Sequence, residues 1–376
     1  MSPETEDKRF AQEKEEILKS INPVRIIAPI LLGLGVVGFL FYRAYLRNSD
    51  EIKNIAWDKH VLFWVIMAFV LLIIRHLAYA NRLRVLSDND FSWRKCIELI
   101  FIWEFSSAVS PTSVGGSAVA LVVLAQEKLT TARTTTIVLY SAILDTIFFV
   151  GTLPILLFFL GPEIIRPELT TLTSLDGWGI TFLGAYILML AYGSLFFYGL
   201  FINPKITRRL LRWVTGGKGW LSRFRPVADQ LGRDFIVSSR EIWRKKFAFH
   251  AEAFLSTATA WSCRFLLLNF LIIAFVPAIS TEFWTQFALY ARLETMFVII
   301  AFSPTPGAAG FAEIVFYGFL NDYVSAESVA LVIAVIWRFL TYYLYLFMGA
   351  IIIPNWLQGI IKLRQQKRLE REASGE

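Results

Sequence analysis

Cysteine and histidine are scarce in this sequence, and the few that occur are scattered. Cys96 and Cys263 are the two cysteines in 376 residues, so a disulfide framework and a cysteine-rich zinc site are excluded. The three histidines, His60, His76 and His250, have no metal-ligand spacing. The sequence also lacks an ATP-binding G-x-x-x-x-G-K-[ST] loop and a G-x-S-x-G hydrolase elbow. We therefore expect no metal, no cofactor and no enzymatic activity.

Charged residues are also few, at 18%, whereas 56% of the residues are hydrophobic and 15% are Phe, Trp or Tyr. No water-soluble domain needs so much apolar sequence to build its core, which indicates a membrane protein. The hydrophilic start lacks the residue order of a cleaved signal peptide, so the first apolar segment is expected to remain as an anchor. The net charge of +7 is concentrated between Lys205 and Lys246, which indicates a basic belt beside the membrane rather than a nucleic-acid site.

Apolar segments of about 20 residues are long enough to cross a bilayer as helices. The sequence predicts an all-α polytopic protein with six such spans, at 24–45, 59–80, 132–160, 178–203, 249–276 and 327–354.

Two further apolar stretches are interrupted. The stretch near 95–127 contains Ser110-Pro111-Thr112 followed by Gly115 and Gly116, and the stretch near 283–321 contains Ser303-Pro304-Thr305 followed by Gly307 and Gly310. The piece after each break reaches only about half-way through a bilayer at about 1.5 Å per residue. We predict that both are re-entrant hairpins, since a broken backbone at membrane depth must be covered by protein or line a wet cavity.

The loop charges assign a side to each segment. With six spans and two re-entrant hairpins, 28 Lys and Arg residues lie on one side and 5 on the other. The Lys/Arg bias predicts a cell (inner) membrane protein with both termini in the cytoplasm and with hairpins that enter from opposite faces. The predicted parts are a tail (1–23), a first membrane half (24–203), a basic amphipathic linker (204–246), a second membrane half (247–354) and a basic tail (355–376).

The two breaks indicate an internal repeat. The Ser-Pro-Thr triplets are 193 residues apart, and the same offset relates Asp145 to Arg338. Copies that enter from opposite faces form an inverted repeat, whose substrate site lies near the midplane between the halves. We predict that Asp145 and Arg338 form an intramembrane charge pair, either for function or only to hold two helices together.

Charges away from the loops are expensive in a bilayer, so they form the set of candidate residues. Arg75, Glu98 and Glu252 are expected to reach the interface from near the segment ends. The others are Glu104, Asp145, Arg264, Arg292, Glu294, Glu313 and Arg338.

The hairpin tips predict a site for an anionic headgroup, because half-helix N-termini present free N–H groups and glycine permits close approach. The alternative is that the prolines only make turns, the glycines only allow packing, and Glu313 satisfies its own helix start. The predicted headgroup-binding residues are Ser110, Thr112, Gly115, Gly116, Arg292, Thr305, Gly307, Gly310, Glu313 and Arg338.

The basic linker alternates arginine with Leu, Phe and Trp, which is typical of a segment lying on the cytoplasmic leaflet. Its role is surface anchoring or delivery of an anionic lipid to the core. The residues predicted to contact the lipid surface are Arg82, Arg84, Arg208, Arg209 and Arg212.

The order of these features resembles the transmembrane region of the lysylphosphatidylglycerol synthase family, also described as flippase-like membrane proteins. The resemblance is carried by Arg82-x-Arg84, by the first hairpin's Ser110-Pro111 and Gly115-Gly116-Ser117-Ala118, and by the run from Pro304 to Glu313, in which Ala308 stands where the family often has a second glycine. It implies a fold that moves or presents phospholipid-type substrates between leaflets. Lysyl-transferase activity is not expected, because the soluble catalytic domain of the bifunctional members is absent.

Three functions remain open. The first is translocation or presentation of an anionic phospholipid or lipid-linked substrate, with membrane lipids as partners. The second is an accessory or docking subunit for a lipid- or glycan-modifying enzyme at the cytoplasmic face. The third is a proton-coupled transporter of small solutes, in which Glu104, Asp145 and Glu313 would relay protons.

Overall fold

The computed structural model of this chain describes residues 57–109, 123–127, 131–165, 177–203 and 240–356, and single positions outside those ranges (35, 38, 39, 42, 120, 121, 129, 205, 209, 212, 213, 216, 225, 229, 233, 236, 237, 358 and 359). Every regular element in this part of the chain is helical. Five helices are long and apolar enough to cross a membrane: Lys59–Leu86, Arg133–Leu160, Gly177–Ile202, Phe247–Phe275 and Glu327–Trp356. The prediction of an all-α polytopic protein is confirmed, and five predicted spans coincide with these helices. Most of the remaining predicted span, 24–45, lies outside the described residues. The same is true of the predicted tip of the first hairpin and of most of the linker and the two tails.

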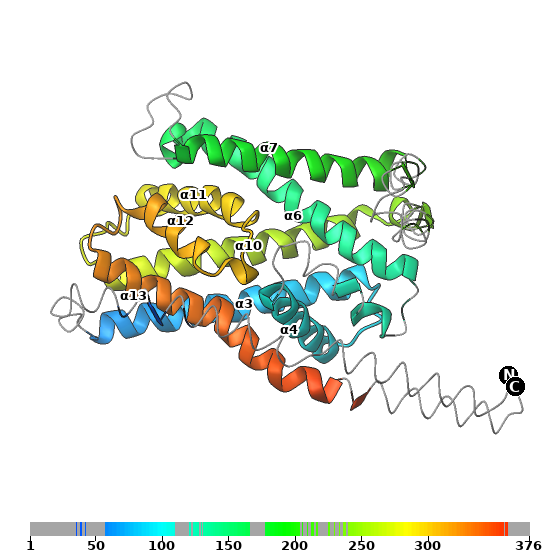
Figure 1. The fold of residues 1–376 in the computed structure, drawn as a ribbon, viewed down its shortest axis with the longest axis horizontal. Coiled ribbons are helices and arrows are strands. Elements are labelled where there is room, and N and C mark those ends of the chain that lie inside the picture. The colour runs from blue at the N-terminus through cyan, green and yellow to red at the C-terminus, as the bar shows by residue number, and fades with distance from the viewer. Residues whose placement is uncertain are drawn as a thin grey trace, which may run out of the picture.

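Two long helices, α3 (Lys59–Leu86) and α10 (Phe247–Phe275), form the centre of the bundle (Figure 1). They run in opposite directions. Near the end of α3, Asn81 donates a 3.0 Å hydrogen bond to Ser256 near the start of α10. At the other end, the Trp57 ring before α3 lies 5.4 Å from the Phe275 ring. The side chain of Asp58 caps α3 by accepting from the Val61 N–H at 2.9 Å.

Helix α6 (Thr131–Leu160) packs against α10, and α7 (Gly177–Phe197) packs against α6 on the outside of the bundle. Pro154 lies inside α6 and has no N–H to donate to the carbonyl of Val150. That carbonyl instead accepts a 3.2 Å hydrogen bond from the Tyr186 hydroxyl of α7. The proline therefore frees an acceptor that joins the two helices.

Three shorter helices account for the interrupted stretches. Helix α4 (Trp93–Val109) follows α3, and α11 (Phe283–Ile300) follows α10 and is joined through a loop to the ten-residue α12 (Phe311–Leu320). Because α3 and α10 are antiparallel, α4 and α11 start from opposite ends of the bundle (Figure 1). In the second stretch α11 and α12 pack against each other, as two halves of a hairpin would. That this hairpin is re-entrant stays a prediction.

The final helix begins as α13 (Glu327–Arg338), passes through a π-helical turn, η5 (Phe339–Tyr343), and continues to Trp356. A π turn inserts an extra residue into the helix and is frequent at functional sites. The outer faces of the bundle carry exposed apolar side chains such as Phe158, Ile180 and Leu255. Such a surface suits lipid rather than water.

Candidate functional site where the helical breaks meet

The end of α4 and the loop after α11 come together in the interior of the bundle. The Tyr342 hydroxyl of the π turn donates to the carbonyl of Ala108, at 3.4 Å, near the end of α4. A Cβ atom on Gly307 would lie 2.8 Å from the same carbonyl oxygen and would also overlap the Tyr342 ring. The end of α4 and the loop after α11 thus meet through backbone, with Tyr342 beside them.

Gly307 has two reasons to be glycine at this contact. Its φ of 55° lies in the left-handed region, and no side chain fits between it and Ala108. The loop around it is bonded internally, since the Ser303 and Thr305 hydroxyls lie 3.0 Å apart. Gly310, with φ of 77°, ends the loop and precedes α12.

Arg338 holds the loop from the side of α13. Its guanidinium donates to the carbonyl of Gly307 at 2.7 Å and lies over the Tyr342 ring at 4.3 Å from the centroid. Its Nε is 3.1 Å from a Glu313 carboxylate oxygen, an ion pair without hydrogen-bond geometry. Glu313 in the first turn of α12 therefore faces Arg338, and the helix start gains no side-chain cap. Because Glu313 already places negative charge there, the N-terminus of α12 is a poorer anion site than predicted.

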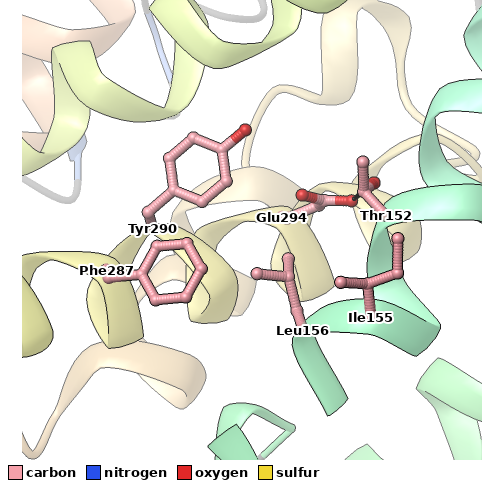
Figure 2. A pocket seen from close by; sticks show the side chains of 6 residues that line it. All are labelled: Thr152, Ile155, Leu156, Phe287, Tyr290 and Glu294. Atoms are coloured by element: carbon pink, nitrogen blue, oxygen red, sulfur yellow. Dashed lines mark hydrogen bonds between the residues drawn. The ribbon is translucent and has the colours of Figure 1, made fainter. Parts of the chain in front are cut away.

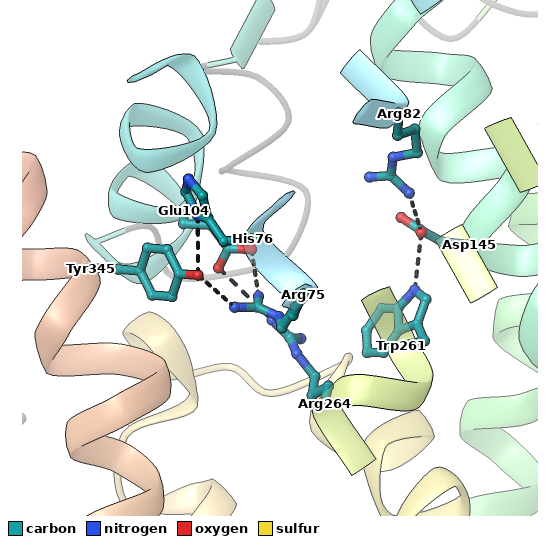
Figure 3. Close-up of polar contacts among 8 residues, drawn as sticks. All are labelled: Arg75, His76, Arg82, Glu104, Asp145, Trp261, Arg264 and Tyr345. Carbon is teal, nitrogen blue, oxygen red and sulfur yellow. Dashed lines mark hydrogen bonds and ion pairs between the residues drawn. The ribbon is translucent and has the colours of Figure 1, made fainter. Parts of the chain in front are cut away.

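A second arginine cluster lies on the α4 side of this contact (Figure 3). Arg75 of α3 is fully buried, with its guanidinium 2.5 Å from a Glu104 carboxylate oxygen and 3.0 Å from the Tyr345 hydroxyl. His76 reaches the same hydroxyl at 3.3 Å with one ring nitrogen. Arg264 of α10 lies 3.8 Å from the other Glu104 oxygen.

This cluster has more positive than negative charge. Arg75 and Arg264 share the single carboxylate of Glu104, and Arg75 has the closer contact. Arg264 makes no hydrogen bond to another described residue; its guanidinium lies over the rings of Trp261 and Phe297, and its Nε is buried without a partner. Its side chain is 20% exposed, so a ligand can reach it. A guanidinium with free donors in an apolar interior favours an anion with several oxygens, such as a phosphate.

The predicted pair between Asp145 and Arg338 is wrong, because each has another partner. Asp145 lies 2.6 Å from Arg82 and accepts a 3.0 Å hydrogen bond from the indole N–H of Trp261 (Figure 3). Arg82 also donates to the Thr257 hydroxyl at 3.3 Å. In the bundle, α3 supplies the nearer cation to Asp145 of α6.

Two other predictions about charged residues are wrong, and both residues lie in α3, which continues to Leu86 rather than ending near residue 80. Arg82 is buried and does not contact the lipid surface as predicted. Arg75 was expected to reach the interface, but the longer helix places it well inside the bundle.

The structure brings some of the other predicted headgroup and lipid-surface residues together and places the rest elsewhere. Thr305, Gly307, Gly310, Glu313 and Arg338 lie together in one loop and its neighbouring helices. Arg292 does not join them, because it bonds to the carbonyl of Phe319 at 3.2 Å and pairs with Asp322, at the far end of α12. Arg84 lies over the Trp93 ring, Arg209 is exposed, and Arg212 pairs with Asp229. Ser110, Thr112, Gly115, Gly116 and Arg208 lie outside the described residues.

Sequence reasoning put Arg75, Glu104 and Arg264 among the candidate charges but not in the headgroup site, and it missed Tyr342 and Tyr345. Only the pairing of α3, α4 and the last helix shows that these side chains converge. Among the described residues, no three His, Cys, Asp or Glu side chains group as ligands of a metal ion.

Comparisons with known proteins confirm the resemblance over most of the chain. An UPF0104 membrane protein of Archaeoglobus fulgidus is 23% identical over 332 residues, which cover 86% of this chain and 94% of that protein. No solved structure matches the chain. The family model described as lysylphosphatidylglycerol synthase TM region matches residues 26–349. The chain therefore belongs to the family of lysylphosphatidylglycerol synthase transmembrane regions.

Proposed function

We propose that this protein moves an anionic phospholipid or lipid-linked substrate between the leaflets of the cell membrane, and that Arg264 binds the phosphate of its headgroup. The observation that carries the proposal is the positive charge left over where Arg75 and Arg264 share Glu104. Burying an arginine without a full partner costs several kcal/mol, and an incoming anion recovers part of that cost. Translocation makes and breaks no covalent bond, so the site needs no nucleophile.

The position of Arg264 supports a lipid as the source of this anion. It lies near the middle of α10, which is long enough to cross the membrane, and its neighbours Trp261 and Phe297 are aromatic. A lipid phosphate that crosses between leaflets must pass this depth with its acyl chains still in the bilayer. A guanidinium at that point lowers the barrier that the charged headgroup meets.

The arrangement of the short helices supports movement of two halves about this site. We infer that α4 and the α11–α12 pair are re-entrant and belong to an inverted repeat, with both termini in the cytoplasm. Sites near the midplane between such halves are typical of alternating-access transporters. The contact between Ala108 and Gly307 is where the two breaks would move relative to each other.

Reconstitution into vesicles tests the proposal. We expect the protein to accelerate leaflet exchange of a fluorescent anionic phospholipid, measured by a quencher that reaches only the outer leaflet. Arg264→Gln should slow this exchange about 10- to 100-fold, the loss expected for one charge-assisted interaction of roughly 1.5–3 kcal/mol. Arg240→Gln is the matched control, since Arg240 is exposed and lies outside both clusters.

Two results would count against this function. One is exchange no faster than in empty vesicles for every anionic headgroup tried. The other is an Arg264→Gln protein that folds and exchanges lipid as fast as the Arg240→Gln control.

The predicted proton relay through Glu104, Asp145 and Glu313 gains no support from the structure. Each of these carboxylates lies within ion-pair distance of an arginine: Arg75, Arg82 and Arg338 respectively.

A further inference from the structure

A small pocket opens on the surface of the bundle between α6 and α11 (Figure 2). Its volume is roughly 260 Å³. The wall is apolar apart from three polar side chains, and Ile155 at its rim is 57% exposed on the lipid-facing side of α6. The lining residues are Thr152, Ile155, Leu156, Phe287, Tyr290 and Glu294.

Glu294 differs from the other buried carboxylates of the bundle. Its exposure is 0%, and no Lys, Arg or His from any described element lies within 4.0 Å of it. The titratable groups that face it are uncharged hydroxyls, Tyr290 on its own helix and Tyr186 on α7, with the Cys263 thiol of α10 beside Tyr290. A buried carboxylate without a cation costs so much that the group takes up a proton instead.

The hydrogen bonds around Thr152 leave its oxygen able to accept that proton. The Thr152 hydroxyl is 2.6 Å from the carbonyl of Phe148 one turn earlier and is also hydrogen-bonded to a carboxyl oxygen of Glu294. A hydroxyl has one proton, and a carbonyl can only accept. With the Thr152 proton on Phe148, the bond to Glu294 requires a proton on the carboxyl group. The second carboxyl oxygen of Glu294 is buried without a hydrogen-bond partner, which also disfavours the ionised form.

We propose that Glu294 is a proton-binding site that is occupied in this conformation and exchanges its proton through the pocket between α6 and α11. Release leaves a carboxylate that keeps one hydrogen bond at most, so it requires water to enter as the two helices separate. The exchange is one proton bound or released by one carboxyl group, and no other bond changes. If the proposed translocation is correct, this step couples it to the proton gradient; that coupling alone rests on the proposed function.

Labelling with dicyclohexylcarbodiimide tests the site without reference to transport. This apolar reagent enters from the bilayer and adds to protonated carboxyl groups, giving an N-acylurea that mass spectrometry can locate. In the full-length protein in vesicles we expect an adduct on Glu294 that diminishes as pH rises and is absent from Glu294→Gln. Glu104, which is paired with Arg75, should stay unlabelled in the same sample.

Two labelling results would overturn the proposal. An absence of adduct on Glu294 at every pH would show that the group is ionised or closed to the bilayer. Labelling that stays constant as pH rises would show a permanently neutral structural carboxyl. Glu294→Gln keeps a neutral hydrogen-bonding side chain of similar size, so it should fold and serve as the reference.

The coupling is measured separately as lipid exchange with and without an imposed proton gradient. We expect a gradient to change the rate several-fold in the unmodified protein and to have no effect in Glu294→Gln. Equal responses in the two proteins would refute the coupling. If the unmodified protein exchanges no lipid, the proposed function fails while the labelling result still decides the proton site.

Discussion

Arginine side chains in this bundle are held by different kinds of partner. Arg82 pairs with a carboxylate, whereas Arg338 donates mainly to a backbone carbonyl, and Arg264 has mostly aromatic neighbours. A carboxylate partner fixes a guanidinium in place, while one held weakly keeps donors available for a ligand. The same residue type therefore serves structure at Arg82 and remains open to a ligand at Arg264.

The pair between Arg82 and Asp145 gives the first mutational prediction. Asp145→Asn should lower the free energy of unfolding by about 3 kcal/mol, because it leaves the buried guanidinium of Arg82 without a carboxylate. Arg82→Gln should lower it less, because Asp145 is 29% exposed and keeps the hydrogen bond from Trp261. Exchanging the two residues should recover part of the loss. A double-mutant cycle measured by unfolding in mixed detergent should give a coupling energy of roughly 1–3 kcal/mol. The cycle for Asp145 and Arg338 is the control and should be additive, and the opposite pattern would contradict the observed pairing.

Adjacent residues in the loop before α12 should respond in opposite directions. Gly307→Ala should destabilise the protein by about 2 kcal/mol or more, because a Cβ meets the fixed carbonyl of Ala108 at 2.8 Å. Ala308 also has a positive φ, 57°, so Ala308→Gly should relieve strain and raise stability by roughly 0.5–1 kcal/mol. Thermal unfolding of the two variants measures both effects. Equal shifts of the same sign would show that the left-handed backbone is not the cause.

The short helices were predictable from length and composition, but the segments against which they pack were not. The Ser-Pro-Thr break and the glycines after it place the end of α11 and the start of α12 correctly, because proline and glycine act locally. The approach of Ala108 to Gly307 depends on two segments about 200 residues apart, which no local pattern encodes. The extent of α3 was underestimated because Arg75, Arg82 and Arg84 were expected to favour the interface. Partner side chains from other parts of the bundle offset the free-energy cost of placing these arginines in a membrane helix.

Cysteine accessibility tests whether the α11–α12 pair is re-entrant. In a background without Cys96 and Cys263, we expect Glu282→Cys before α11 and Asn321→Cys after α12 to react with a membrane-impermeant thiol reagent from outside the cell. Lys246→Cys before α10 should react only after the cytoplasmic side is exposed. All three positions are exposed in the structure. Labelling of Glu282→Cys and Asn321→Cys from opposite sides would mean that the pair crosses the membrane once.

The bundle as a whole joins an apolar outer surface to an interior with several charged groups. Its all-α class and five of the six predicted spans, which coincide with long apolar helices, followed from hydropathy, because the bilayer imposes a minimum length on any spanning helix. The candidate site was only partly predictable: four of its residues lie in the second interrupted stretch as expected, and Arg338 of α13 joins them. The excess of guanidinium over carboxylate emerges only when α3, α4 and α10 are packed together.

Lipid binding should be visible as stability of the entire protein. A ligand that binds only the folded state stabilises it by about 2.7 kcal/mol at a concentration of 100 Kd. Adding an anionic phospholipid to the protein in detergent should therefore raise its Tm by a few degrees. A zwitterionic lipid should raise it less, and Arg264→Gln should remove the difference between the two lipids. If both lipids stabilise the Arg264→Gln protein as they do the original, the phosphate binds elsewhere.

The burial of Arg75 also constrains how the chain enters the membrane. Glu104 lies 29 residues later in the sequence, and Tyr345 lies 270 residues later. At about 5–20 residues per second, synthesis reaches Glu104 after roughly 1–6 s and Tyr345 after roughly 14–54 s. Until α4 arrives, α3 carries an arginine that costs roughly 2.5–3.5 kcal/mol at the centre of the bilayer. Biogenesis therefore includes an interval in which insertion of α3 depends on its leucine-rich neighbours or on the insertion machinery to shelter that charge.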